Sequence, residues 1–322
     1  MDKLFLLDAY ALIYRAYYAF IKNPRINSKG MNTSAVMGFV NTLNEILTKE
    51  QPTHIGVAFD QGKTFRDEAF PAYKAQREAT PEDIRASVPI IKDIITAMHI
   101  PVLQVDGFEA DDVIGTLATK AGEAGVQTYM LTPDKDYGQL VRDNVFIFRP
   151  RHGGGYETMG PKEVCEKYEL HSPIQVIDLL ALMGDSADNF PGCPGVGPKT
   201  ATKLIAEFGS IDSILENSAK IKGKLREKVE GAVDDIRMSK FLATIRTDVP
   251  IDLDLDALKL QEPDTARLAE IFTELEFKSL LDKFVKKPQQ PQKSVNLQLD
   301  LFAENPTEDA VGSEFSSHES LK

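Results

Sequence analysis

Lys3-Leu-Phe-Leu-Leu-Asp8 is a short apolar run that ends on an acidic residue, and the same pattern returns twice further along the chain. His54-Ile-Gly-Val-Ala-Phe-Asp60 and Val126-Gln-Thr-Tyr-Met-Leu-Thr-Pro-Asp134 also stop on an aspartate. Runs of this length are typical of strands that are buried on both faces of a parallel sheet. A fourth apolar segment, Pro101 to Val105, leads into Gly107-Phe-Glu-Ala-Asp-Asp-Val113, which opens a helix.

Helical patterns lie between these runs, so the order along the chain is strand, helix, strand, helix. We expect helices at about Tyr10 to Phe20, Ser34 to Lys49, Pro81 to Met98 and Ala110 to Gly122. This alternation predicts an α/β protein with a mostly parallel sheet. Right-handed crossovers bring the carboxyl ends of the strands to one edge, where open α/β sheets bind their ligands.

Nine acidic residues are predicted to lie at this edge: Asp8, Asp60, Glu109, Asp111, Asp112, Asp134, Asp136, Asp185 and Asp188. One such residue alone would be explained by helix capping or by the helix dipole. Two like charges about 4 Å apart repel by about 4 kcal/mol at an effective dielectric near 20, so such a cluster must bind cations or protonate. Carboxylate oxygens suit Mg²⁺ or Mn²⁺, and two divalent ions would provide in-line displacement at a phosphate.

The stretch Leu182-Met-Gly-Asp-Ser-Ala-Asp-Asn-Phe-Pro-Gly-Cys-Pro-Gly-Val-Gly-Pro-Lys-Thr-Ala201 joins two of these acids to a glycine-rich turn. Three glycines predict a tight backbone path that other residues do not tolerate cheaply: Gly192, Gly195 and Gly197. Pro198 then suits the first turn of a helix over Lys199 to Phe208. Backbone N–H groups at such a helix start can hold a phosphate. The alternative interpretation is a capped loop between two helices.

Composition limits the class of protein. A chain of 322 residues with 42% apolar content can bury a large core in one or two domains. The sequence shows no transmembrane run and no signal peptide. Cys165 and Cys193 show neither metal-ligand spacing nor a disulfide framework, and this cysteine usage predicts a reducing cytoplasm. A net charge of −12 argues against a general polyanion binder. Bases nevertheless gather in two local clusters, which are either solvated faces or DNA contacts: Lys63, Arg66, Lys74 and Arg77; and Lys199, Lys203, Lys220, Lys222, Lys224, Arg226 and Lys228.

From Lys286 onward the composition turns polar, and we interpret residues 286–322 as a disordered linker. One apolar island, Gln298-Leu-Asp-Leu-Phe302, stands within it. The island is either a chance feature or a short linear motif that docks into a groove of a partner.

Five blocks of sequence follow one another along roughly the first 285 residues: Leu6-Leu-Asp-Ala-Tyr-Ala-Leu-Ile-Tyr-Arg-Ala-Tyr17, Thr64-Phe-Arg-Asp-Glu-Ala-Phe-Pro-Ala-Tyr-Lys74, Gly107-Phe-Glu-Ala-Asp-Asp112, Thr132-Pro-Asp-Lys-Asp136 and Gly184-Asp-Ser-Ala-Asp-Asn-Phe-Pro-Gly-Cys-Pro-Gly-Val-Gly197. In their order and spacing they resemble the 5′-nuclease domain of bacterial DNA polymerase I, a member of the flap endonuclease superfamily. The island in the tail resembles the peptide by which bacterial replication proteins dock on the sliding clamp, through Gln298, Leu299, Leu301 and Phe302.

The resemblance implies a PIN-like core with a twisted sheet in residues 1–180 and a helical arch near residues 62–90. It implies a helix-3-turn-helix DNA-binding element and further helices in residues 181–285. The implied activity is metal-dependent cleavage of DNA at 5′ ends and 5′ flaps, in primer removal and repair, by a cytoplasmic monomer with no membrane association. The end of the chain has the composition of a linker, which suggests the front part of a longer polymerase, although stand-alone 5′-nucleases exist.

Site residues are also implied by the resemblance. The first metal would be held by Asp8, Asp60, Glu109 and Asp111, and the second by Asp134, Asp136, Asp185 and Asp188, with Asp112 acting nearby through water. Arg15 and Lys74 match basic residues of the family that contact the scissile phosphate. Arg66 matches a further phosphate contact at the foot of the arch, and Tyr14 matches an aromatic residue that stacks on the terminal nucleobase. DNA contacts with help from K⁺ are implied for the turn and the helix that follows: Gly192, Gly195, Val196, Gly197, Lys199 and Thr200.

The chain departs from the family pattern in two places. Asp8 is followed by alanine rather than the frequent glycine, and the segment from Asp60 to Arg66 is one residue shorter, which leaves the register of Arg66 open. Three alternatives also remain. A PIN-like RNA nuclease would share the acids but not the Gly184 to Gly197 turn, a DNA-junction binder would lack catalysis, and a phosphatase would use Asp8 as nucleophile.

Overall fold

The computed structural model describes residues 2–151 and 154–285. In these residues six strands form one sheet in the order β3-β2-β1-β4-β5-β6, and all neighbours are parallel except β5 and β6. The strands are β1 (Lys3–Asp8), β2 (His54–Ala58), β3 (Val102–Leu103), β4 (Gln127–Leu131), β5 (Val145–Pro150) and β6 (Tyr156–Met159). The predicted α/β class with a mostly parallel sheet is confirmed.

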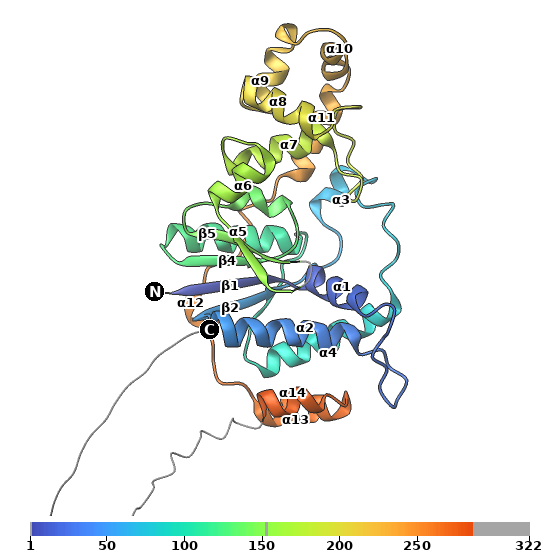
Figure 1. Ribbon diagram of the computed structural model, residues 1–322, viewed down its shortest axis with the longest axis vertical. Helices are drawn as coiled ribbons and strands as arrows, with labels where there is room; N and C mark the ends of the chain where they lie inside the picture. Colours follow the sequence, from blue (N-terminus) through green and yellow to red (C-terminus); the bar gives the residue numbers. More distant parts are fainter. Residues whose placement is uncertain (1, 152–153, 286–322) are drawn as a thin grey trace, which may run out of the picture. The chain divides into compact units, whose positions relative to one another are not determined.

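The two faces of the sheet belong to two separate apolar clusters, because successive side chains of a strand point to opposite sides. Leu4 and Leu6 of β1 pack in the cluster that contains α5 (Ala110–Glu123). Phe5 and Leu7 pack in the other cluster, which contains α2 (Ser34–Glu45) and α4 (Glu82–Ala97). Figure 1 shows α5 on one side of the strands and α2 and α4 on the other. The continuous apolar runs in the sequence follow from this burial on both faces.

The helices expected between the strands are present. The chain forms α1 (Ala9–Ala19), α2, α4 and α5 near the expected positions, and a π-helical turn, Ile46–Glu50, extends α2. β5, β6, α6 (Pro161–Tyr168) and α7 (Val176–Met183) were not predicted from the sequence. Across residues 62–90, where a helical arch was expected, the described chain contains the short helix α3 (Phe65–Ala69), then turns and irregular chain, and from Glu82 the first part of α4.

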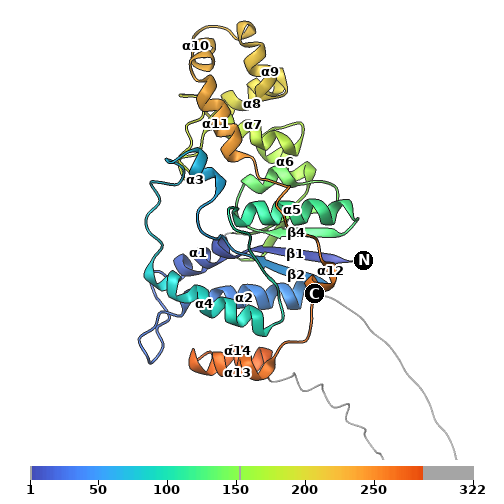
Figure 2. The same ribbon diagram turned by 180° about the vertical axis from the view of Figure 1, so that it is seen from behind.

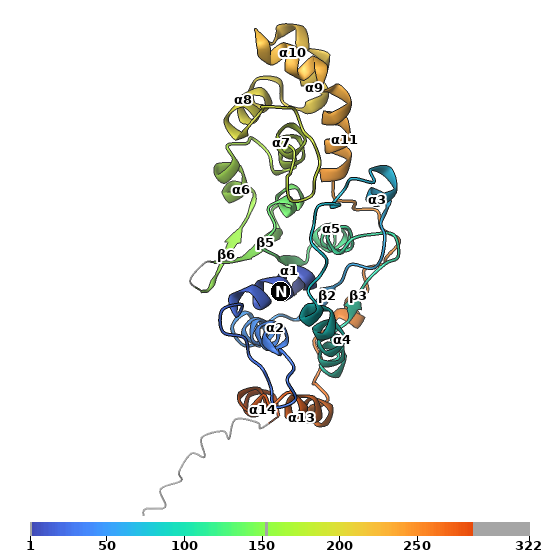
Figure 3. The ribbon, with the colours of Figure 1, turned by 90° about the vertical axis from the view of Figure 1, so that its right-hand side faces the viewer.

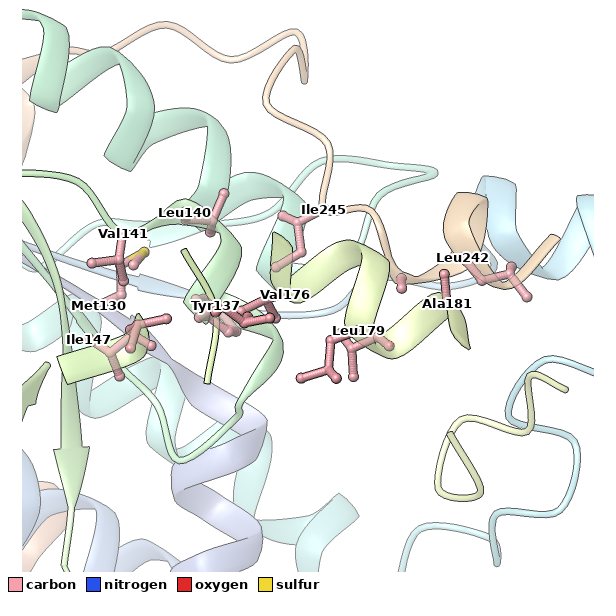
Figure 4. Packing of buried hydrophobic residues seen from close by; sticks show 14 of the residues in the cluster. Met130, Tyr137, Leu140, Val141, Ile147, Val176, Leu179, Ala181, Leu242 and Ile245 are labelled. Atoms are coloured by element: carbon pink, nitrogen blue, oxygen red, sulfur yellow. The ribbon is translucent and has the colours of Figure 1, made fainter. Parts of the chain in front are cut away.

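Four further helices follow the glycine-rich turn: α8 (Pro198–Phe208), α9 (Ile211–Glu216), α10 (Lys224–Gly231) and α11 (Val233–Ala243). They gather beyond α7, as Figures 2 and 3 show, and α7 contacts both α8 and α11. Their buried side chains continue the cluster on the α5 face of the sheet. Figure 4 shows the junction, where Val176 and Leu179 of α7 lie between the sheet residues Met130 and Ile147 and the α11 residue Leu242.

The chain then forms α12 (Leu255–Leu258), whose Leu258 still packs in the cluster on the α5 face. It crosses to the other face of the sheet and forms α13 (Thr265–Glu274) and α14 (Lys278–Phe284), and α13 packs against α4. Along the parts of the chain that the structure describes, no helix combines the length and the apolar character needed to cross a membrane. Cys165 and Cys193 are both free thiols.

Candidate active site

The ends of β1 and β2 hold the first two acids in place. Asp8 is the last residue of β1 and caps α1, accepting a hydrogen bond from the Ala11 N–H at 3.1 Å. Its other oxygen accepts from the hydroxyls of Thr132 and Tyr137, each at 3.3 Å. Asp60 lies just beyond β2 and accepts from the Ala110 N–H at 2.7 Å. Asp60 therefore joins the edge of the sheet to the start of α5, and Asp8 joins it to α1 and to the segment after β4.

Acids from distant segments share one region: Asp8 accepts hydrogen bonds from Thr132 and Tyr137, on either side of Asp134 and Asp136, and Lys135 between those two acids binds Asp185. Burial, followed by the charges of Asp60 and Asp134, raises the pKa of Asp8 to about 7. Burial raises the pKa of Asp136 well above its ordinary value, and the neighbouring carboxylates of Asp134, Asp188 and Asp185 raise it further. Carboxylates influence each other to this extent only when they are close together. The acids that follow β1, β2 and β4 thus converge with those of the loop after α7.

A second group of acids surrounds Lys74. The Lys74 Nζ lies 2.8 Å from Glu109 Oε1, and the Tyr73 hydroxyl donates to Glu109 Oε2 at 3.1 Å and to Asp188 Oδ2 at 3.4 Å. Burial lowers the pKa of Lys74, but the carboxylates of Glu109, Asp188 and Asp111 outweigh this effect and the net shift is upward. Lys74 therefore remains a cation among these acids.

Two buried carboxylate oxygens, Asp111 Oδ1 and Asp136 Oδ1, have no hydrogen-bond partner. A buried charged oxygen without a partner is costly, and a hard divalent cation is the ligand that satisfies carboxylates. As placed, no three His, Cys, Asp or Glu side chains of the described chain surround a common point at coordination distance. Basic side chains hold several of the acids instead: Lys74 binds Glu109, Lys135 binds Asp185 and Arg77 binds Asp188. The donor chemistry of the residues fits divalent metal ions.

The interpretation of Arg66 as a phosphate contact does not fit the structure. Its side chain is 1% exposed, and it donates to both oxygens of Asp112 at 2.7 and 2.8 Å and to Glu109 at 3.3 Å. Its remaining hydrogen bonds reach the carbonyls of Leu242 and Thr244, at 2.9 and 3.0 Å. All of its donor groups face protein atoms, so Arg66 joins the start of α3 to the end of α11.

The interpretation of Asp112 as a residue that acts on the metal also needs correction. Asp112 is 0% exposed, and besides Arg66 it accepts hydrogen bonds from the backbone N–H groups of Glu109 and Arg246, at 3.2 and 2.8 Å. Its two oxygens are therefore occupied by four donors. Asp112 stabilises the first turn of α5, where the neighbouring acids are presented.

Tyr14 and Arg15 lie on α1, the helix that Asp8 caps. The Tyr14 hydroxyl bonds to the Thr80 hydroxyl at 3.1 Å, and its half-buried ring stacks on Tyr18 with ring centres 6.3 Å apart. Arg15 is exposed. Tyr18, which is 55% exposed, extends the aromatic surface of Tyr14 and was not singled out from the sequence.

The glycine-rich turn depends on a close backbone approach between Gly184 and Gly192. Gly192 has φ +61°, and a Cβ there would lie 2.2 Å from the Gly184 nitrogen; a Cβ on Gly184 would lie 2.7 Å from the Phe190 oxygen. Gly195 also has a positive φ, at +74°. Gly197 does not need to be glycine, because its φ is −98° and a Cβ would meet open space. The prediction for Gly197 was therefore wrong, and the essential partner, Gly184, was missed.

The start of α8 is accessible from solvent. Gly197 caps the helix, Pro198 is its first residue, and both are exposed together with Lys199, while Thr200 is half-buried. Val196 is only 4% exposed, so its side chain anchors the turn in the core. Backbone N–H groups at an accessible helix start form a site for a phosphate.

A set of backbone contacts that was not predicted joins residues 72–77 to the loop 185–189. The Lys74 N–H donates to the Asp188 carbonyl at 2.9 Å, and the Asn189 side chain donates to the Ala72 carbonyl at 2.6 Å. Arg77 adds a hydrogen bond to the Ala187 carbonyl at 3.2 Å and an ion pair with Asp188. In the sequence Arg77 was visible only as a member of a basic cluster. Lys135 was not singled out, although it stands between Asp134 and Asp136.

Comparison with known proteins gives two matching family models. One, described as "5′-3′ exonuclease, N-terminal resolvase-like domain", matches residues 3–169, and one described as "5′-3′ exonuclease, C-terminal SAM fold" matches residues 171–266. DNA polymerase I of Bacillus caldotenax is 39% identical over 313 residues, which cover 96% of this chain and 35% of that protein. DNA polymerase I of Bacillus subtilis is 42% identical over 285 residues, which cover 87% of this chain and 32% of that protein. The chain thus spans about a third of the length of these relatives.

Among solved structures, the 5′-exonuclease of bacteriophage T5 with bound zinc matches with a TM-score of 0.64 and 21% identity, covering 88% of this chain and 97% of that one. A complex of the T5 flap endonuclease with DNA and metal ions matches with a TM-score of 0.65 and 20% identity over the same shares. At these identities the likeness concerns the fold. The assignment rests on the family models: because the first of them alone covers more than half of the residues, the chain belongs to the 5′-3′ exonuclease family.

Proposed function

We propose that this chain hydrolyses phosphodiester bonds of DNA at 5′ ends and 5′ flaps, with two divalent metal ions, Mg²⁺ or Mn²⁺, held by its acidic edge. The observation that carries the proposal is the convergence of acids from the ends of three strands and the loop after α7, with two buried carboxylate oxygens left without partners. In the same proposal the chain works on DNA in primer removal and repair, as a cytoplasmic monomer and as part of a longer polymerase.

Eight acids would hold the metal ions: Asp8, Asp60, Glu109 and Asp111 the first, and Asp134, Asp136, Asp185 and Asp188 the second. When bound, such ions would activate water and offset charge on the phosphate and the leaving oxygen. Asp112 would position this set through its bonds to Arg66 and to the start of α5.

Lys74 would supply a positive charge to the scissile phosphate. Its side chain is only 25% exposed and its ammonium lies 2.8 Å from Glu109, so the charge is already at the edge where the phosphate must bind. Burial makes such a charge more effective than it would be in water. Arg15, which is exposed on α1, would add a second charge, and the ring of Tyr14 would stack on the terminal base.

The turn and the start of α8 would hold the uncleaved part of the DNA by its phosphates. The backbone at the accessible start of α8, around Lys199, and the exposed lysines of α8 and α10 contact the DNA phosphates in this proposal, with K⁺ at the carbonyls of the Gly192 to Gly197 turn. Binding through phosphates carries little sequence information and weakens steeply with salt.

The experiment is cleavage of 5′-labelled flap, nicked, blunt and RNA-primed DNA in Mg²⁺, with single-stranded RNA alongside. We expect cleavage of the flap, and loss of cleavage with retained junction binding in Asp136→Asn. Asp143→Asn, which changes an exposed aspartate before β5, should cleave like the wild type. Near-normal cleavage by Asp136→Asn would remove Asp136 from the mechanism, and activity only on RNA or on a small phosphomonoester would replace the proposal with one of its rivals.

Docking on a sliding clamp remains a proposal from the sequence alone. The residues concerned lie outside those that the structure describes: Gln298, Leu299, Leu301 and Phe302. Docking on a clamp would raise the local concentration of the nuclease at nicks. A peptide of residues 293–306 should bind the clamp, and the absence of binding at high micromolar concentration would end this part of the proposal.

A further inference from the structure

The ammonium of Lys135 is bound to one of the eight acids. Lys135 Nζ lies 2.5 Å from Asp185 Oδ2, and the Asp185 side chain is only 10% exposed. The other oxygen of Asp185 accepts from the Ala187 N–H at 2.7 Å. The carboxylate is thus fixed by the backbone on one side and by Lys135 on the other.

Lys135 is also the neighbour of two further acids along the chain. Asp134 and Asp136 flank it, and the Asp136 N–H donates to Asp134 Oδ1 at 3.0 Å, which bends the segment so that both carboxyls lie near Lys135. One oxygen of Asp136 stays buried without a partner. A single ammonium therefore faces three carboxylates and can neutralise only part of their charge.

We propose that Lys135 is a tethered cation that stabilises Asp185 in the metal-free protein and is displaced when a divalent ion binds to Asp134, Asp136 and Asp185. The inference rests on the proposed function, because it assumes that these acids hold a metal. An ammonium and a divalent ion repel each other and compete for the same carboxylate oxygen. Lys135 therefore sets how much metal is needed to load this part of the site.

The structure provides space for the released side chain. Lys135 lines a cavity of about 380 Å³ between α6, α7 and α8, with apolar lining from Leu179 and Met183 and with Glu169, Lys167 and Lys199 as its other charged residues. The side chain of Lys135 is 43% exposed already, so its ammonium can leave Asp185 without losing contact with water. The alkyl stem can meanwhile lie on the apolar lining, as lysine side chains commonly do.

Removing the ammonium should tighten metal binding. Lys135→Met keeps much of the stem and deletes the charge, so the metal ion no longer displaces an ion pair. We expect Mn²⁺ to bind up to about fivefold more tightly, which corresponds to the loss of one partly exposed ion pair. Lys135→Arg keeps the charge and should stay close to the wild type.

The test is calorimetric titration of the whole chain with Mn²⁺ for the wild type, Lys135→Met, Lys135→Arg and Lys162→Met. Lys162 is an exposed lysine on α6 that pairs with Glu166 at 3.8 Å, so its replacement controls for the loss of one surface charge. A second readout is the rise in Tm between EDTA and saturating Mn²⁺, which should be larger for Lys135→Met than for the wild type and unchanged for Lys162→Met.

The outcomes separate this inference from the proposed function. Tighter binding in Lys135→Met alone supports it. Equal or weaker Mn²⁺ binding in Lys135→Met overturns it, and weaker DNA cleavage with unchanged Mn²⁺ affinity would show that Lys135 contacts the substrate instead. If the wild type itself bound no Mn²⁺, the proposed function would fall and this inference with it.

Discussion

Replacing Arg66 by methionine removes a guanidinium that is 1% exposed and that bonds to three carboxylate oxygens and two carbonyls. Deleting one partner of a buried ion pair costs about 3 to 5 kcal/mol, because the other charge stays buried without compensation. Asp112 would keep the N–H groups of Glu109 and Arg246, which places the expected cost near the lower end of that range. We therefore expect Arg66→Met to lower the free energy of unfolding by about 3 kcal/mol.

The assay is urea unfolding at neutral pH in EDTA, which separates folding from metal binding. Far-UV circular dichroism is the suitable probe because the chain contains no tryptophan. Arg267→Met is the matched control: Arg267 pairs with Asp93 at 2.6 Å and Glu270 at 2.9 Å, but its side chain is 47% exposed. Exposed pairs contribute at most about 1 kcal/mol, so this variant should unfold almost like the wild type.

A double replacement checks the origin of the loss. If the cost of Arg66→Met comes from a stranded Asp112, then Arg66→Met combined with Asp112→Leu should cost less than the sum of the two single variants. The reasoning is refuted if Arg66→Met unfolds within about 1 kcal/mol of the wild type while its binding to a flap junction weakens, a result that would restore Arg66 as a phosphate contact.

Three further predictions address the turn, the acids and the DNA surface. Gly192→Ala should lower the free energy of unfolding by more than about 2 kcal/mol, whereas Gly197→Ala should change it by less than about 0.5 kcal/mol. Equal urea midpoints for the two variants would contradict the close backbone approach between Gly184 and Gly192. Without metal, burial and neighbouring acids raise the pKa of Asp8 from 3.8 to about 7, so between these pH values the native protein holds a proton that the unfolded chain releases. The free energy of unfolding in EDTA should therefore fall as pH rises from about 4 to about 7. Urea melts at several pH values should show a smaller decline for Asp8→Asn. Lys199→Ala should weaken junction binding and reduce the slope of log K against log salt by about 1 for any sequence, and a loss confined to one sequence would argue against a phosphate contact.

The strand-terminal acids could be predicted from the sequence because two general rules of parallel sheets determine their position. An apolar run that is buried on both faces ends at the edge of the sheet, and parallel connections place those edges together. These two rules are enough to predict that Asp8 and Asp60 lie at this edge, as the structure has them. The same reasoning missed β5 and β6, since it followed only the runs that end in an acid.

The partners of the charged residues could not be predicted in this way. Arg66 and Lys74 belong to one basic cluster in the sequence, yet the first is buried against Asp112 and the second is half-buried at Glu109. Which of them meets a phosphate depends on how residues 72–77 pack on the loop 185–189, and that contact is long-range. Gly197 shows the same limit, because a glycine in a turn reveals neither its φ nor the space around it.

The claim on which the account depends is that acids from separate segments form one site for divalent ions. Counting bound Mn²⁺ by electron paramagnetic resonance tests it most directly, with the wild type beside Asp136→Asn and the control Asp143→Asn. We predict two ions per chain in the wild type and in Asp143→Asn, and fewer in Asp136→Asn. No bound Mn²⁺ in the wild type, or the same number and affinity in Asp136→Asn, would contradict the account.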